Sequence, residues 1–438
     1  MALPLEDFGY PKYDEGYSLG FGWEEVAVAP AKKVRKHRLW PMLGPAFVAA
    51  VAYVDPGNVA ANISAGATYS YMLVWVLVLA NLMAVLVQYQ SAKLGLVTGR
   101  SLPEILGDRL PKRRRIAFWM QAETIAAATD LAEIIGGAIA LQLLFDLPLI
   151  VGGLIVGAVS MSLLIFQNAK RQRQFEAIVV ALLVVITGGF LAGLFIEPPS
   201  ASGVVSGLVP RFSDTNSVLI AASMLGATVM PHAIYLHSSL VNHRFNKKNR
   251  NLKILLRATR TDVVFALIVA GAVNLGLLLL AASALGGHAG TDSIEGAHAA
   301  IEAVLGSGIG VVFAVGLLAS SLASTSVGAY AGSEIMGGLL HVRVPLWARR
   351  LVTLIPALIV LWVYPNPSWA LVISQVALSF GIPFAIIPLT WYTASKDVMG
   401  DYRDGTAMKI AMAAVSALIV ALNFALIYLT FTGVDVPA

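Results

Sequence analysis

Long apolar runs recur along the whole chain, and they constrain its fold more than any other feature. Eleven stretches are dominated by leucine, valine, alanine and isoleucine, and most reach the roughly 20 residues that a helix needs to cross about 30 Å of hydrocarbon. They lie near residues 42–66, 71–96, 115–145, 148–167, 176–196, 217–240, 260–286, 299–338, 349–364, 367–394 and 407–432. Because lipid offers no partner for backbone polar groups, we predict an all-α polytopic membrane protein with about 11 transmembrane helices.

The composition supports this class and excludes others. Charged residues make up 13% of the chain, whereas soluble domains carry about 25%. The formal charge of +5 could indicate nucleic-acid binding, but the basic residues lie in short loops between apolar runs, so we expect no nucleic-acid partner. The absence of cysteine excludes disulfides and thiolate metal ligands.

The basic residues also predict the orientation. If each apolar run crosses the membrane once, 29 of the 30 lysines and arginines fall on one side, and only Arg211 falls on the other. Basic loops stay in the cytoplasm, so we expect a cell-membrane protein with a cytoplasmic N-terminus and an extracellular C-terminus. The first 30 residues lack a basic region followed by an apolar signal segment, and residues 1–40 are interpreted as a cytoplasmic tail before a transmembrane domain at 41–432.

Helix-breaking residues interrupt the first and sixth apolar runs at corresponding places. The first contains Asp55-Pro56-Gly57-Asn58, and the sixth contains Met230-Pro231-His232 about 175 residues later. Proline removes a backbone donor and blocks a carbonyl, so both helices should unwind in mid-membrane. Paired breaks are typical of inverted-repeat transporters, which predicts a 5+5 repeat at about 42–196 and 217–394 with an extra helix at 407–432.

The residues at these breaks suggest an ion site. A charge at bilayer depth costs at least about 2.5–3.5 kcal/mol, so Asp55 is expected to be functional. Asn58 could instead cap the second half-helix, and Met230 alone would usually be core packing. Together with unwound carbonyls such as those of Ala52 and Ala227, they form a mixed oxygen and sulfur ligand set. Calcium and magnesium prefer oxygen, so this set favours transition metals.

The two motifs resemble the signature of the Nramp (natural resistance-associated macrophage protein) family of proton-coupled divalent metal transporters. The likeness extends over all the apolar runs and implies the leucine-transporter-like fold and secondary active import of manganese, ferrous iron or similar ions with protons, by alternating access. The metal ligands that it implies are Asp55, Asn58, Met230, the carbonyls of Ala52 and Ala227, and Gln375 in the tenth run. A related branch that moves magnesium lacks this methionine, so Met230 argues against that branch.

The third apolar run carries three acids. Their offsets of seven and three residues place Glu123, Asp130 and Glu133 within roughly 80° of one helix face. Such acids must be protonated, paired or hydrated in a membrane, as a proton relay beside Asp55 would require. A buried structural salt-bridge network is the alternative interpretation.

Basic partners for these acids are expected at the ninth and sixth runs. Arg349 and Arg350 begin the ninth run, and His232 could link the metal site to the acids. The Nramp resemblance places Asp130 and Arg350 on the proton route. His237 could either transfer protons or bond within its helix.

The sequence leaves few alternatives to metal transport. The chain contains no His-Glu-x-x-His, Gly-x-Ser-x-Gly or phosphate-binding Gly-x-x-x-x-Gly-Lys motif, so we expect neither an enzyme nor a resident cofactor. A sodium-coupled amino-acid carrier of the same fold and a channel remain as alternatives. No obligate protein partner is evident. Gln88, Asn274 and Asn423 are expected to form interhelical hydrogen bonds.

Overall fold

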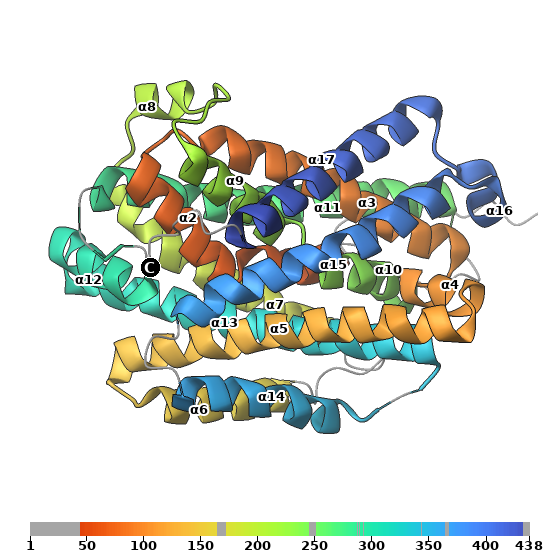
Figure 1. Cartoon of the computed structure of the whole chain (residues 1–438), viewed down its shortest axis with the longest axis horizontal. Coiled ribbons are helices and arrows are strands. Elements are labelled where there is room, and N and C mark those ends of the chain that lie inside the picture. Colours follow the sequence, from red (N-terminus) through yellow and green to blue (C-terminus); the bar gives the residue numbers. More distant parts are fainter. Residues whose placement is uncertain are drawn as a thin grey trace, which may run out of the picture. The chain divides into compact units, whose positions relative to one another are not determined.

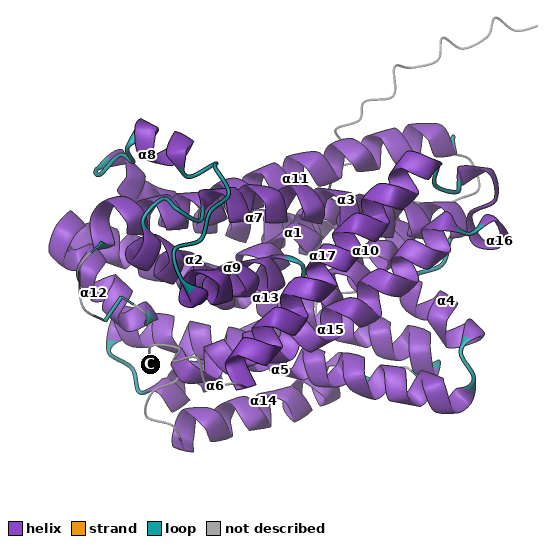
Figure 2. Cartoon of the chain, turned by 45° about the horizontal axis from the view of Figure 1, so that its top comes forward, coloured by secondary structure: helices purple, strands orange, loops and turns teal. Residues whose placement is uncertain are grey.

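The computed structural model describes residues 44–163, 172–244, 251–286, 288, 290–291, 293–342, 344–363 and 368–431. Within these residues the chain forms helices joined by loops, without strands (Figures 1 and 2). The tail predicted at residues 1–40 lies outside the described part. The all-helical prediction is therefore confirmed for the part that the structure describes.

The helices follow the predicted apolar runs closely. The first half contains α1 (Pro45–Val51), η2 (Ala52–Val54), α2 (Pro56–Tyr69), α3 (Val74–Thr98), α4 (Leu102–Arg109), α5 (Lys112–Phe145), α6 (Leu149–Leu163), α7 (Gln172–Leu191) and η4 (Ala192–Phe195). The middle contains α8 (Ala201–Ser206), α9 (Thr215–Thr228), α10 (Pro231–Arg244), α11 (Leu252–Leu280), η6 (Ala281–Leu285), α12 (Ile294–Leu305) and α13 (Ser307–Leu340). The last part contains α14 (Leu346–Val363), α15 (Ser368–Ala394), α16 (Lys396–Met399), η7 (Gly400–Tyr402) and α17 (Thr406–Phe431).

Length and composition agree with a membrane protein. Seven helical segments in the described part, with α9 and α10 counted together as one, have at least 18 residues and are apolar enough to cross a membrane, and three shorter apolar segments accompany them. Each of the 11 predicted runs contains helix. The division into two repeats stays a prediction.

The prediction of one helix at 299–338 was wrong. The helix α12 ends at Leu305, and α13 begins at Ser307 after a break at Gly306. Gly306 has a φ of 92°, which a residue without a Cβ adopts easily and other residues rarely do. The sequence analysis also missed α4, whose Ser101 and Glu104 form a capping box at its start.

The broken helices lie deep in the bundle. Every residue of α10 from Pro231 to Val241 is buried, as is every residue from Val48 to Val59. The helices α5 and α13 pack along one another beside them. The helix α17 crosses the near face of the bundle in Figure 1, and its apolar side chains Ile410 and Phe424 are exposed. The interruptions are therefore shielded by protein, where non-helical backbone is tolerated at membrane depth.

Candidate functional site

The first helix breaks where its sequence predicts. After α1 the chain forms the tight turn η2, and Asp55 is extended with φ −75° and ψ 166°. Pro56 then starts α2 at a position where its missing N–H leaves no bond unmade. The Asp55 carboxylate caps α2 by accepting a bond of 2.9 Å from the Asn58 backbone N–H.

The sixth predicted helix breaks in the same manner. The helix α9 ends at Thr228, and Val229 leaves helical geometry with φ −103° and ψ 84°. Pro231 opens α10, again at its first position. The two residues between the half-helices, Val229 and Met230, are both fully buried.

The side chain of Asn58 joins the two breaks. Its Nδ2 donates to Asp55 Oδ1 at 2.6 Å and to the carbonyl of Ala227 at 3.1 Å. One further oxygen of each side chain, Asp55 Oδ2 and Asn58 Oδ1, is buried without a hydrogen-bond partner among the described residues. Buried acceptors are normally satisfied, so this pair suits a cation. Met230 and Ala52 belong to the same buried cluster.

This arrangement contains few of the residues that usually mark a metal site. Among the described residues there is no group of three or more histidines, aspartates and glutamates that could hold a metal. The predicted ligand set contains only one such side chain, Asp55, because its other donors are an amide, a thioether and carbonyls. The tenth-run residue Gln375 lies in α15, but its side chain falls outside the described part of the structure.

Neighbouring helices satisfy the unwound backbone of η2. Asn274 of α11 donates to the Tyr53 carbonyl at 2.7 Å, and its Oδ1 accepts a bond of 3.0 Å from Asn62 of α2. The hydroxyl of Ser320 on α13 donates to the Val54 carbonyl. The interhelical role predicted for Asn274 is confirmed, whereas Asn423 bonds to Ile419 within its own helix.

The two break prolines rest against glycines of other helices. A methyl group at Gly136 of α5 would overlap the ring of Pro56. A methyl group at Gly381 of α15 would come within 3.0 Å of Pro231 Cγ. Small residues therefore let α5 and α15 approach the site closely.

The predicted acids of α5 divide into paired and unpaired groups. Asp130 is buried and accepts bonds from the Arg350 guanidinium and the Thr353 hydroxyl of α14. Arg350 also donates to Ser160 of α6, with distances of 3.2 Å from Nε and 2.9 Å from Nη2. Nearer the start of α5, Glu123 pairs with Arg349 at 2.8 Å.

Glu133 and His232 are buried without such partners. Neither side-chain oxygen of Glu133 and neither ring nitrogen of His232 has a hydrogen-bond partner among the described residues. Glu133 lies three residues after Asp130 on α5, and His232 directly follows Pro231 at the start of α10. Buried ionisable side chains without partners in the described part of the chain therefore stand both at a broken helix and on the helix that carries the acid of the Arg350 pair.

His237 bonds across helices, so the interpretation of a bond within its own helix was wrong. Its Nδ1 lies 2.8 Å from Gln88 Oε1, and Gln88 Nε2 donates to the Tyr53 hydroxyl at 2.8 Å. The predicted interhelical role of Gln88 is confirmed. This chain joins α10, α3 and the unwound turn η2.

Sequence reasoning missed several residues that complete these contacts. Ser160, Ser320 and Thr353 are single hydroxyls on apolar helices and carry no distinguishing signal. The four-residue spacing of Gly328 and Gly332 on α13 is a signal that could have been used. A methyl group at Gly328 would come within 3.2 Å of Glu133, and one at Gly332 would overlap the Arg349 guanidinium.

The fold and the paired breaks are those of a polytopic helical transporter built around broken helices. Residues 46–429 match the sequence profile of the family described as natural resistance-associated macrophage protein-like. The chain belongs to the Nramp family, which confirms the family resemblance and the expectation of a transporter rather than an enzyme.

Individual relatives agree with this assignment. The chain is 55% identical over 396 residues to the "Divalent metal cation transporter MntH" of Mycobacterium tuberculosis, covering 90% of this chain and 92% of that protein. A crystal structure of the Eremococcus coleocola manganese transporter matches with a TM-score of 0.83 and 30% identity, covering 92% and 90% of the two chains. The nucleobase-cation-symport transporter Mhp1, at 14% identity and a TM-score of 0.52 over 88% and 91% of the chains, shares the fold alone.

Proposed function

We propose that this protein imports divalent transition-metal ions across the cell membrane, coupled to protons, by alternating access. The observation that carries the proposal is the contact between the two helix breaks, where the Asn58 amide donates both to Asp55 and to the Ala227 carbonyl. Two buried oxygens there, Asp55 Oδ2 and Asn58 Oδ1, have no hydrogen-bond partner among the described residues. One carboxylate and one amide oxygen supply hard ligands for a dehydrated cation. The names of the relatives, which include divalent metal and manganese transporters, support the same substrate class.

In this proposal the metal is held by side chains and by unwound backbone. Asp55 Oδ2 and Asn58 Oδ1 face the ion, and the carbonyls of Ala52 and Ala227 add oxygen ligands from the two breaks. Met230 supplies the sulfur that favours manganese and ferrous iron over calcium and magnesium. Gln375 joins the ligand set in some conformations, as the family resemblance implies.

The proton path in this proposal runs from the metal site along α5. Asp55, His232 and Glu133 have no salt-bridge partner among the described residues, whereas Asp130 is paired with Arg350. If metal binding at Asp55 displaces a proton onto a neighbouring carboxylate, and that carboxylate releases the proton on the side where the metal leaves, the two fluxes run in the same direction. Glu123 with Arg349 and the His237 bond to Gln88 extend the polar path.

Uptake by purified protein in proteoliposomes tests the function. Metal entry and internal pH are followed together for manganese, ferrous iron, cadmium, calcium, magnesium and leucine. We expect saturable uptake of the first three with acidification of the lumen, and little uptake of the others. Leucine uptake with sodium would favour the amino-acid carrier instead, and non-saturable metal flux would favour a channel.

A further inference from the structure

The short half-helix α1 leads into the first break. It has seven residues, ends at Val51, and packs among α7, α10, α11 and α13 (Figure 2). The lysine and arginine pattern assigns its first residues to the cytoplasmic side, and Asp55 follows after the single turn η2. Residues 48–51 are all buried. An ion that leaves Asp55 for the cytoplasm must therefore pass along α1.

The first turn of α1 cannot cap itself. Gly44 is the N-cap residue and has no side chain, and Pro45 has no backbone N–H to donate. Gly44 adopts a φ of 143°, and a methyl group there would come within 2.7 Å of Glu176 Oε2. A serine or aspartate cap is therefore excluded at this position, and the free donors of the turn need an acceptor from another helix.

Asp262 of α11 supplies this acceptor. Its Oδ1 accepts a bond of 3.0 Å from the Gly44 N–H, and its Oδ2 accepts a bond of 3.0 Å from the Ala46 N–H. The two donors flank Pro45, so one carboxylate satisfies both free amides. Asp262 is 2% exposed and forms no salt bridge among the described residues. Its printed partners are thus the two amides at the start of α1.

A salt bridge lies against the same end of α1. Arg244, the last residue of α10, places Nη1 3.3 Å from Glu176 Oε2 of α7. The same oxygen lies against Gly44. The first turn of α1 is thus in contact with side chains of α7 and α11, while its other end is the unwound turn η2. Because the helix is broken there, α1 can move as a short unit about this hinge.

We propose that Asp262 is a positioning residue that holds α1 closed over the cytoplasmic side of the metal site, and that this cap opens each time an ion leaves. The inference rests on the proposed transport function, because alternating access requires the cytoplasmic side to open and close. Asp262 is not among the proposed metal ligands and acts through the backbone of Gly44 and Ala46. Loss of the cap should therefore expose α1 without removing a metal ligand.

Cysteine labelling tests the cap, since the chain has no cysteine of its own. Ala50→Cys places a thiol on buried α1, and Ala138→Cys places one at the buried contact of α5 with α6. A methanethiosulfonate reagent is applied to the cytoplasmic face of inside-out vesicles that carry the full chain. Asp262→Asn keeps the side-chain shape but loses one acceptor. We expect it to raise the labelling rate at position 50 about tenfold, as for one lost charged hydrogen bond, while position 138 stays protected.

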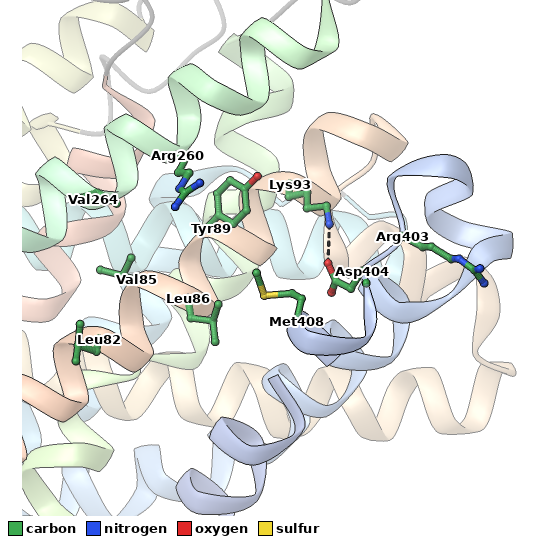
Figure 3. A pocket seen from close by; sticks show the side chains of 11 residues that line it. Leu82, Val85, Leu86, Tyr89, Lys93, Arg260, Val264, Arg403, Asp404 and Met408 are labelled. Atoms are coloured by element: carbon green, nitrogen blue, oxygen red, sulfur yellow. Dashed lines mark hydrogen bonds and ion pairs between the residues drawn. The ribbon is translucent and has the colours of Figure 1, made fainter. Parts of the chain in front are cut away.

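Asp404→Asn is the matched control. Asp404 is another buried carboxylate on the side assigned to the cytoplasm, but its ion-pair partner is Lys93 of α3 at 2.6 Å (Figure 3). This variant should leave position 50 protected. Gly44→Ala gives an independent route to the open state, because the added methyl group displaces the start of α1 from Glu176 while Asp262 is retained. It should also raise labelling at position 50.

Two outcomes would overturn the proposal. One is unchanged labelling at position 50 in both Asp262→Asn and Gly44→Ala. The other is an equal increase at positions 50 and 138, because the carboxylate would then support the whole bundle rather than α1. The labelling rates require no metal, so both outcomes differ from a failure of metal uptake by the unchanged protein, which would reject the proposed function instead.

Discussion

The side-chain amide of Asn58 connects the two helix breaks. The Nδ2 group of Asn58 uses both of its hydrogens inside the protein, one on Asp55 and one on the Ala227 carbonyl. Its oxygen and Asp55 Oδ2 are both without a hydrogen-bond partner among the described residues. The capping and ligand interpretations of Asn58 are therefore compatible, because the donor side of the amide organises the breaks while the acceptor side stays available.

Replacing Met230 by alanine should change selectivity. Loss of the thioether removes the one soft donor, so calcium should compete with manganese much better, by about tenfold or more. Competition uptake in proteoliposomes measures this ratio. Met224→Ala is the matched control, since Met224 is equally buried on the preceding half-helix, and both changes should destabilise the fold by about 2–5 kcal/mol. Unchanged calcium discrimination in the Met230 variant would refute the sulfur ligand.

Asp130→Asn should uncouple the two fluxes. The amide keeps the shape of the side chain but removes the charge that faces Arg350, so metal can still move while metal-stimulated acidification of vesicles disappears. A lumenal pH dye read beside metal uptake checks this outcome. Thr353→Val removes the hydroxyl contacts to Asp130 and to the Arg350 carbonyl but leaves every charge in place, so it should preserve coupling. Intact proton flux in Asp130→Asn would leave the buried salt-bridge network as the better interpretation.

Among the elements, α13 positions charged groups that belong to other helices. At Gly332 the helix has no side chain, and the Arg349 guanidinium of α14 packs directly on that glycine. The same guanidinium donates to the Ala329 carbonyl at 3.2 Å. Arg349 then reaches Glu123 of α5. Three helices thus meet around one arginine, and a small residue on α13 makes this possible.

A methyl group at Gly332 should displace the Arg349 guanidinium from its contacts with α13 and Glu123. Gly332→Ala overlaps the guanidinium, so Arg349 must leave Glu123, and the free energy of unfolding should fall by about 1–3 kcal/mol. Gly337→Ala on the same helix meets no heavy atom within 4 Å and should change stability by no more than about 1 kcal/mol. Thermal unfolding in detergent compares the two variants. Equal effects would show that Arg349 is not fixed by the close approach.

For the whole molecule, the absence of cysteine makes the predicted orientation directly testable. Ser202 on α8 and Asp401 in η7 are both exposed and fall on opposite sides by the lysine and arginine pattern. In intact cells a membrane-impermeant maleimide should label Ser202→Cys, whereas Asp401→Cys should react only after permeabilisation. The unchanged chain is the blank. Reversed labelling would invert the orientation and the direction of import.

More of the fold than of the candidate site could be predicted from the sequence. Periodic apolar runs locate the membrane helices because hydrocarbon imposes a length and a polarity on every spanning segment. They do not locate breaks between two apolar helices, which is why α12 and α13 were joined across Gly306. For the acids, helical periodicity placed Asp130 and Glu133 on one face but could not say which would be paired.

The sequence by itself determined the membrane-spanning class, the two proline breaks and the residue types that stand beside them, because each of these depends on local composition. Only the tertiary structure decided that the breaks touch through Asn58, that Arg350 takes Asp130 while Glu133 stays unpaired, and that Gln88 connects His237 to Tyr53. These contacts join residues far apart in the chain. They depend on how helices pack, and packing geometry is not encoded in any single segment.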